Sequence, residues 1–303
     1  MADEKLSQLR QLCGGAGGEV DKQLRKGGED GLDDATLKRW LVARKGDVKE
    51  AAKDLQAHAA WRAAYVPGGI IRAEEVADDI AHNKAFVPGF DRAGRPFTIV
   101  VVSRHQVKDA EASKRYIAYA LDCLIRLGST RPGWDGKTSG IFDLRGLKAS
   151  NCDFATLRNV FDLLQHHYPE RLHTLWLYNA PYIFYGLYKM VYPFIDPVTR
   201  EKVKFIYEKD AEAEFLAAFD PSVLPPEICS KGTGRWVTVQ EQYDRLLKDG
   251  AAAAGGAQQQ QQQPEASAMA AANGAASAAA TQLQELQAEA PGEVGLRPIE
   301  VVA

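Results

Sequence analysis

Three groups of residues have the types that phosphate binding, metal binding and acid–base catalysis require. The first is Gly133–Thr138, whose sequence GWDGKT ends like a phosphate-binding loop. Such a loop needs four residues between its first glycine and the Gly-Lys pair, and a helix after it. Only two residues intervene here and a strand is expected next. We therefore interpret this run as a plain loop.

Histidines and one aspartate are the other candidates for chemistry. His166 and His167 are adjacent near the end of an expected helix, where neighbours do not share a face, and His173 follows them. No cysteine lies at ligand spacing nearby, so no metal site is expected. Asp143 lies in an apolar strand, where an aspartate more often anchors a loop than acts as a general base. Without a GxSxG or Cys–His motif, we expect no catalytic site, no cofactor and no enzyme.

The segment from Trp176 to Phe205 holds more large apolar side chains than one helix face can bury. A helix that is apolar on nearly all sides is deeply buried or faces an apolar ligand or a membrane. The basic residues Arg171, Lys189 and Lys202 flank or interrupt the segment, which favours a lipid-like ligand with an anionic headgroup. A dense protein core is the alternative.

An α/β framework is expected to position these residues. Apolar residues at helical spacing predict one helix from Asp33 or Asp34 and another after Asp47, ended by Pro67. Gly89–Pro96 is read as a turn. The predicted strands alternate with helices, which favours a mixed, mostly parallel sheet. These strands are Phe97–Val102, Gly140–Leu144, Leu175–Tyr178 and Val203–Tyr207.

The two ends of the chain differ in composition from the middle. Residues 1–31 are polar and glycine-rich and predict a short helix with a loose leader. Beyond Gly250, alanine and glutamine runs with almost no aromatic residues predict a disordered tail. The expected organisation is a leader (1–32), a helical unit (33–68), an α/β lobe (75–240) and the tail (251–303).

Composition narrows the cellular setting. The formal net charge is -3 and no element is strongly basic, which argues against a nucleic-acid partner. Four scattered cysteines without a CxxC pair suit a reducing cytosol. The chain shows no secretory signal and no apolar run of about 18 residues. We expect a cytoplasmic protein that makes transient contact with membrane surfaces from outside.

Several motifs, in order, resemble the CRAL-TRIO lipid-binding family. They are LKRWLVARKGDVKEAAKDLQAHAAWR (37–62), GFDRAGRPF (89–97), IFDLRGL (141–147), the long run from HYPER to KVKFI (167–206) and an altered closing element, LPPEICSKGTG (224–234). The resemblance implies a helical unit packed on a sheet lobe. It also implies an apolar lipid pocket on the sheet, closed by a helical gate similar to Tyr188–Phe205.

The resemblance also implies a headgroup site. In the phosphatidylinositol-transfer branch, an Arg-Lys pair, a Glu-Arg pair, and a Thr and a Lys hold the inositol phosphate. The matching residues here are Arg44, Lys45, Glu170, Arg171, Thr199 and Lys202. Guanidinium and ammonium groups suit phosphate by charge. A role in the fold alone is the alternative for this set.

Two further assignments concern a second lipid headgroup and contact with the membrane. Thr138 is a candidate contact for a second lipid headgroup, although Gly140 stands where relatives carry another hydroxyl. Phe194, Ile195 and Val198 are the candidates for membrane contact at the gate. The expected function is lipid binding and exchange, with phosphatidylinositol as the expected lipid. A carrier of a prenol, tocopherol or sterol-like ligand, and a lipid-cued module with a protein partner on its tail, are the alternatives.

Overall fold

A computed structural model describes residues 2–106, 109–151 and 154–249. Four helices come first and make up the helical unit. They are α1 (Ala2–Leu12), α2 (Glu19–Lys26), α3 (Asp34–Ala43) and α4 (Val48–Tyr65). Aspartates set two of their starts, because the Asp33 side chain accepts from the amide of Thr36 at 2.7 Å and Asp47 caps α4.

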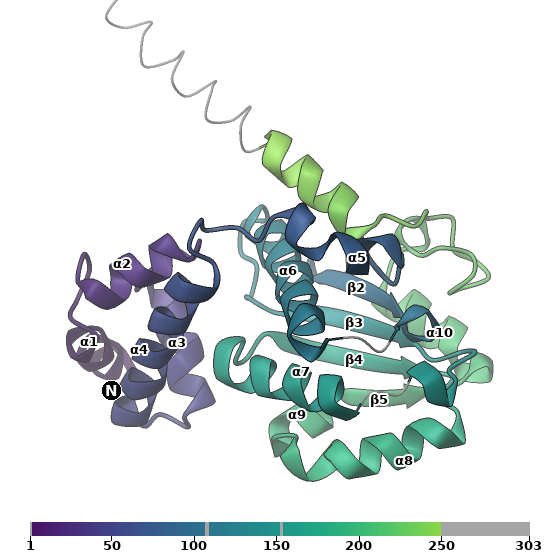
Figure 1. The fold of residues 1–303 in the computed structure, drawn as a ribbon, viewed down its shortest axis with the longest axis horizontal. Coiled ribbons are helices and arrows are strands. Elements are labelled where there is room, and N and C mark those ends of the chain that lie inside the picture. The colour runs from purple at the N-terminus through teal and green to yellow at the C-terminus, as the bar shows by residue number, and fades with distance from the viewer. Residues whose placement is uncertain (1, 107–108, 152–153, 250–303) are drawn as a thin grey trace, which may run out of the picture. The chain divides into compact units, whose positions relative to one another are not determined.

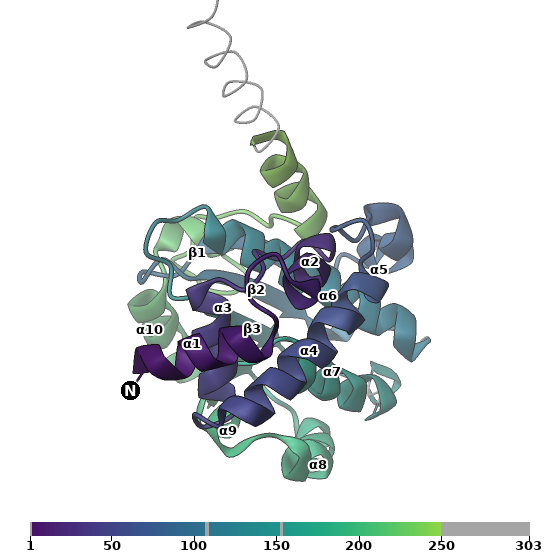
Figure 2. The ribbon, with the colours of Figure 1, turned by 90° about the vertical axis from the view of Figure 1, so that its left-hand side faces the viewer.

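Residues expected to form a loose leader are part of the helical core. Leu9 of α1 and Leu24 of α2 are fully buried together with Leu37 and Trp40 of α3 and Leu55 of α4. Figure 2 shows these helices gathered into one group. The expectation of looseness was wrong because it weighed the glycines and charges, whereas a few leucines at helical spacing suffice to bury one face.

The lobe alternates strands with helices around one five-stranded sheet (Figure 1). Its strands are β1 (Ala85–Phe90), β2 (Pro96–Val101), β3 (Thr138–Asp143), β4 (Leu172–Tyr178) and β5 (Val203–Ile206). Its longer helices are α5 (Ala77–Ala81), α6 (Ala110–Ser129), α7 (Phe154–His167), α8 (Tyr182–Val191), α9 (Pro197–Glu201) and α10 (Glu208–Ala218). A final helix begins at 239.

Short 3-10 turns link these elements. They are η1 (Ala73–Val76), η2 (Val102–Arg104), η3 (Ala149–Asn151), η4 (Tyr192–Phe194) and η5 (Pro221–Val223). The sheet order is β1-β2-β3-β4-β5, with β1 antiparallel to β2 and the other neighbours parallel. The prediction of a mixed, mostly parallel sheet is confirmed.

The strand β1 was missed by the sequence analysis, which placed Gly89 and Phe90 in a turn. The turn begins only at Asp91, directly after the end of β1. The Asp91 side chain accepts from the amides of Ala93 and Arg95 at 2.9 and 2.8 Å. Pro88 and Gly89 lie inside the strand, where a break in register allows them. Their presence hid the strand signal.

Helices cover both faces of the sheet. Helix α10 packs Phe215 and Phe219 against Ile99 and Trp176 on one face, while α6, α7 and α8 lie on the other. Within the described residues, no helix is both long enough and apolar enough to cross a membrane.

Candidate functional site

The sheet face beneath α6, α7 and α8 is apolar but only half-buried. Its side chains form two rows in register across the strands: Thr98, Gly140, Leu175 and Val203, and then Val100, Phe142, Leu177 and Phe205. Every apolar member except Leu177 is partly exposed. On the opposite face, Phe97, Ile99 and Ile141 are fully buried. This face is therefore covered less completely than the opposite one, and we refer to these two rows of side chains as the apolar trough.

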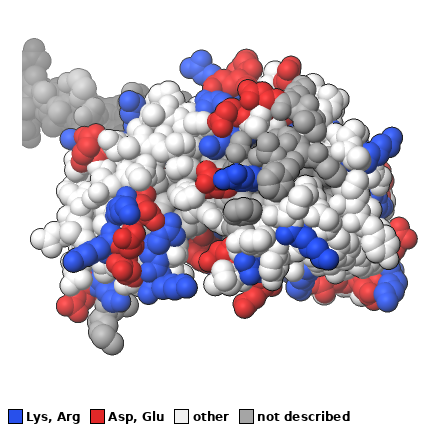
Figure 3. All heavy atoms as spheres, turned by 60° about the horizontal axis from the view of Figure 1, so that its bottom comes forward, with Lys and Arg blue, Asp and Glu red and all other residues white. Residues whose placement is uncertain are grey.

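Helix α8 covers the trough and is apolar on both sides. Phe184 and Val191 are buried, with Phe184 in a cluster that includes Leu144 and Leu177. On its outer side, Ile183 and Met190 are 43% and 54% exposed. Figure 3, which brings the α8 side of the molecule forward, shows a broad uncharged area with charged side chains scattered around it. The predicted gate, Tyr188–Phe205, is not one helix, because it divides among the end of α8, η4, α9 and the start of β5.

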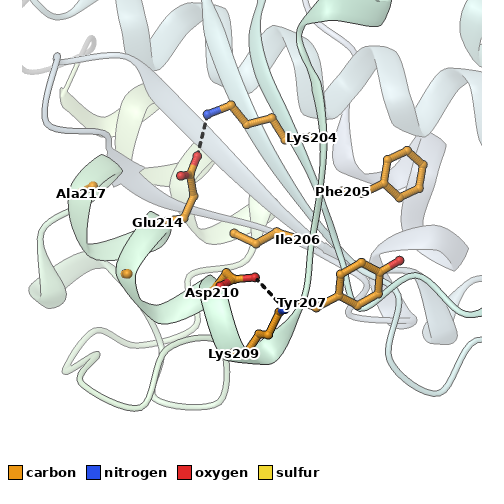
Figure 4. Close-up of a pocket in the computed structure, with 9 residues that line it drawn as sticks. Lys204, Phe205, Ile206, Tyr207, Lys209, Asp210, Glu214 and Ala217 are labelled. Atoms are coloured by element: carbon orange, nitrogen blue, oxygen red, sulfur yellow. Dashed lines mark hydrogen bonds and ion pairs between the residues drawn. The ribbon is translucent and has the colours of Figure 1, made fainter.

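Two open hollows lie near the end of β5, and Phe205 lines one of them. One, of about 690 Å³, lies between β5 and α10 (Figure 4). Lys204 donates to Glu214 there at 2.6 Å, and Glu214 also accepts from Trp176 at 3.0 Å. The other, of about 540 Å³, is lined in part by Tyr182, Tyr185 and Lys189. The charged groups of the first are already paired, so it offers no obvious lipid headgroup site.

Two of the candidate headgroup residues face each other at the end of the sheet. The Lys202 ammonium lies 3.4 Å from a carboxylate oxygen of Glu170, and both side chains are largely buried. Thr199 belongs to the same turn, since its carbonyl accepts from the amide of Lys202 at 3.1 Å. Asp196 caps the short helix that carries Thr199 by accepting from Val198 at 2.9 Å. The fold thus joins Glu170, Thr199 and Lys202.

Arg171 lies beside this group with an incomplete set of partners. It donates to the carbonyl of Gly136 at 2.9 Å and lies over the Trp134 ring, but its buried Nε has no hydrogen-bond partner. Burial, followed by the charge of Arg39, lowers the pKa of Arg171 to about 9. A charged guanidinium without a carboxylate partner among the described residues is a suitable neighbour for an anion.

Arg44 and Lys45 lie at the end of α3 in the helical unit. Arg44 forms an ion pair with Asp54 of α4. Lys45 is exposed and makes no ion pair within the described residues. No hydrogen bond or ion pair in the described part of the chain joins Arg44 or Lys45 to Glu170 or Lys202. The structure therefore brings together the lobe half of the candidate set and leaves the helical-unit half apart.

Backbone strain marks one residue in each half. Lys45 and Glu170 have positive φ angles of 52° and 57°. The other non-glycine residues with positive φ in the described chain are Asn83 and Asn179, a residue type that tolerates this conformation. Strained backbone of this kind is concentrated at functional sites. A lysine and a glutamate in this conformation fit better with a binding role than with a purely structural one.

The candidate second-lipid contact is already occupied by protein. Thr138 is buried, and both its amide and its hydroxyl donate to the carbonyl of Arg171, at 2.7 and 3.3 Å. These bonds hold the start of β3 against the residue that directly precedes β4. In this conformation Thr138 fixes the position of Arg171.

The gate candidates differ in their placement. The side chain of Phe194 lies outside the described residues. Ile195 is 1% exposed, so the expectation that it forms an outer edge does not hold in this structure. The carbonyl of Ile195 accepts from Arg200 Nε at 2.8 Å, which ties this residue to α9. Val198 is 46% exposed and remains a candidate for membrane contact.

A buried polar network joins the helical unit to the lobe, and the sequence analysis missed it. Arg62 of α4 donates to Asp122 of α6 at 2.6 and 3.2 Å, and to the Tyr168 hydroxyl at 3.1 Å. Tyr168 donates to Asp122 at 3.0 Å. The available signal was the position of Arg62 on the otherwise apolar face of its helix, which indicates a buried partner.

Comparisons with known proteins agree with this architecture. Residues 80–228 match the CRAL/TRIO domain family, and the chain therefore contains a CRAL/TRIO domain. A CRAL-TRIO domain-containing protein of Schizosaccharomyces pombe is 31% identical over 55% of this chain, which spans only 16% of that relative. The phosphatidylinositol transfer protein CSR1 of Eremothecium gossypii is 28% identical over 71% of this chain and 51% of its own length.

A solved structure shows the same fold. The crystal structure of Sfh5 superimposes with a TM-score of 0.56, covering 79% of this chain and 91% of that one, at 16% sequence identity. This likeness concerns the fold. CRAL/TRIO domains form a lipid-binding and lipid-transfer family.

Proposed function

We propose that this protein is a non-enzymatic carrier that binds one phosphatidylinositol molecule and transfers or presents it at membranes. The half-buried apolar trough beneath α8 carries the proposal, because it offers acyl chains an apolar surface inside the fold. Two acyl chains hold roughly 30 methylenes, each worth about 0.8 kcal/mol when removed from water. Such a ligand has to enter from a bilayer rather than through solvent.

The headgroup end of the site supports an inositol phospholipid. Lys202 and Arg171 supply positive charge and Glu170 supplies an acceptor for hydroxyl groups. The relative named as a phosphatidylinositol transfer protein supports the same choice. Arg44 and Lys45 complete the site if the helical unit shifts toward the lobe when lipid binds.

Membrane contact is assigned to the outer side of α8 and to Val198 of α9. Ile183, Met190 and Val198 are exposed apolar residues that would lie in the bilayer interface while the gate opens. The free, buried cysteines Cys13 and Cys123 suit a reducing compartment. The proposed location is therefore the cytoplasm, peripheral to membranes.

An apolar-ligand carrier is the second candidate. Arg44 and Thr138 already have protein partners, as they would if the basic set served the fold and the ligand were a prenol, tocopherol or sterol. Native mass spectrometry of the purified full chain separates the two by the mass of the co-purified ligand. A phosphatidylinositol mass, together with transfer between vesicles, supports the proposal. A prenol, tocopherol or sterol mass without phosphatidylinositol transfer overturns it.

A further inference from the structure

Two histidines meet where the helical unit contacts the lobe. His58 of α4 is 1% exposed, and its Nδ1 lies 3.2 Å from Nδ1 of His167, the last residue of α7. The Nε2 of His58 lies 2.8 Å from a carboxylate oxygen of Glu29. Trp61 stacks on His167 with ring centroids 3.6 Å apart and an angle of 14° between the planes. Two contacts to His167, from His58 and from Trp61, thus bridge the helical unit and the lobe, and Glu29 holds His58 from within the helical unit.

This geometry limits how many protons the pair can hold. A carboxylate only accepts, so the Nε2 of His58 donates to Glu29. One proton then lies between the two Nδ1 atoms, donated by one ring to the lone pair of the other. If both rings were positively charged, two N–H groups would point at each other across 3.2 Å. While His58 and His167 remain in contact, the pair therefore carries at most one positive charge.

The surroundings oppose a charge on His167. Burial, followed by repulsion from His58, His166 and Lys114, lowers the pKa of His167 to about 3, and Glu29 offsets only part of this. The folded junction therefore holds His167 neutral at any physiological pH.

The other charged groups at the junction are held or balanced. Arg62 is paired with Asp122 at 2.6 Å and lies 3.6 Å from Glu29. Arg39 and Arg171 add positive charge, which also disfavours a second cation there. A positive charge on His167 would therefore be offset only in part, by Glu29, which already faces His58, Arg62 and Arg39.

The pair lies next to the proposed headgroup residues in the chain. His167 is followed by Tyr168, which hydrogen-bonds Arg62 and Asp122, and then by Pro169, Glu170 and Arg171. Movement of His167 away from the helical unit displaces the N-terminal end of Tyr168–Arg171. The same movement separates Trp61 from the ring that it covers.

We infer that His58 and His167 are positioning residues for Tyr168–Arg171, and that proton uptake by His167 separates the helical unit from the lobe and weakens lipid retention as the pH falls below about 6.5. The lipid part of this inference rests on the proposed function. The junction part does not, because it depends only on the contacts between α4 and α7.

The direction follows from proton linkage. A histidine whose pKa is lowered in the closed state takes up a proton when the junction opens, so acid favours opening. With an ordinary histidine pKa near 6.5 in the open state and about 3 in the closed state, the opening equilibrium rises by about 30-fold between pH 7.5 and pH 5.

The test compares two histidine variants of the full chain. His167→Phe keeps an aromatic ring against Trp61 but cannot take up a proton, while His166→Ala removes the neighbouring exposed imidazole that pairs with Asp162. Lipid-loaded protein is incubated with phosphatidylcholine vesicles from about pH 7.5 to about pH 5, and the retained lipid is measured. Wild type and His166→Ala should lose lipid faster in acid, by about 30-fold, and His167→Phe should not.

A second readout keeps the inference testable if His167→Phe folds poorly. The imidazole protons of wild-type His167 are followed by NMR through the same pH range, together with amide exchange in α4. Titration of His167 coupled to loss of protection in α4 supports the inference, whatever the ligand proves to be. Titration near pH 6.5 with α4 still protected overturns it, as does an unchanged pH profile in His167→Phe. Absence of phosphatidylinositol transfer at neutral pH would count against the proposed function alone.

Discussion

Arg62 and Asp122 lie 60 positions apart in the sequence and share two hydrogen bonds, of 2.6 and 3.2 Å, between α4 and α6. The carbonyl of Gly27 also accepts from Arg62, at 2.8 Å, so one guanidinium holds three parts of the fold. Both side chains are buried. This pair is the centre of a buried polar network between the helical unit and the lobe.

Removal of one partner should therefore be costly. Arg62→Leu leaves the buried Asp122 carboxylate without its cation, and we expect the free energy of unfolding to fall by about 3–5 kcal/mol. Urea unfolding followed by circular dichroism measures the change. Arg10→Ala is the control, because Arg10 pairs with Asp34 at an exposed position, where an ion pair contributes at most about 1 kcal/mol. Equal losses in the two variants would show that Asp122 is stabilised by other groups.

Headgroup choice should depend on Lys45 and Lys202 together. Each ammonium is expected to contribute about 1.5–3 kcal/mol through a charged hydrogen bond, so Lys45→Ala with Lys202→Ala should weaken phosphatidylinositol binding by two to four orders of magnitude. Vesicle transfer assays measure the loss. Lys204→Ala is the control, since Lys204 lies two residues away on β5 and pairs with Glu214. Retained transfer in the double variant would support a purely structural role for both lysines.

The strained backbone at Lys45 predicts that one substitution raises the free energy of unfolding and lowers the affinity for phosphatidylinositol. Lys45→Gly relieves the cost of φ 52° and should raise the free energy of unfolding by about 0.5–1 kcal/mol, while phosphatidylinositol affinity falls with the lost charge. Lys49→Gly, in the first turn of α4, should instead lower stability by up to about 1 kcal/mol and leave affinity unchanged. Thermal unfolding and lipid binding measured on the same samples check both. A stability loss in Lys45→Gly would mean that the lysine side chain supports the fold.

Membrane contact should map to the outer side of α8. Ile183→Asp with Met190→Asp places two charges on the exposed apolar surface and should stop transfer between vesicles without removing bound lipid from the protein. Val42→Asp is the control, because Val42 is 62% exposed but lies on α3 in the helical unit. Normal transfer by the α8 double variant would place the entry route elsewhere.

Substitutions at Ile195 and Val198 test whether the first is buried and the second exposed. Ile195→Asp buries a carboxylate at a position that is 1% exposed, so it should lower the melting temperature, whereas Val198→Asp at an exposed position should not. Differential scanning calorimetry separates the two. An unchanged melting temperature in Ile195→Asp would support the sequence prediction that this residue faces outward.

Local patterns in the sequence determined most of the elements. The start of α3 at Asp33, the run of apolar residues in β2 and the all-round apolarity of α8 depend on residues within a few positions of one another. Such signals survive without knowledge of the fold, because helix and strand periods repeat over short distances. They failed in β1, where Pro88 and Gly89 favour a turn although both lie inside the strand.

Tertiary structure alone decided which distant groups meet. The sequence likeness placed Lys45 and Lys202 in one site, but the fold joins only Lys202 to Glu170 and leaves Lys45 exposed. It also brought His58 to His167 across 109 positions. Partners at such separations are chosen by how whole helices pack, and a sequence pattern carries no record of the rotation and depth at which one helix meets another.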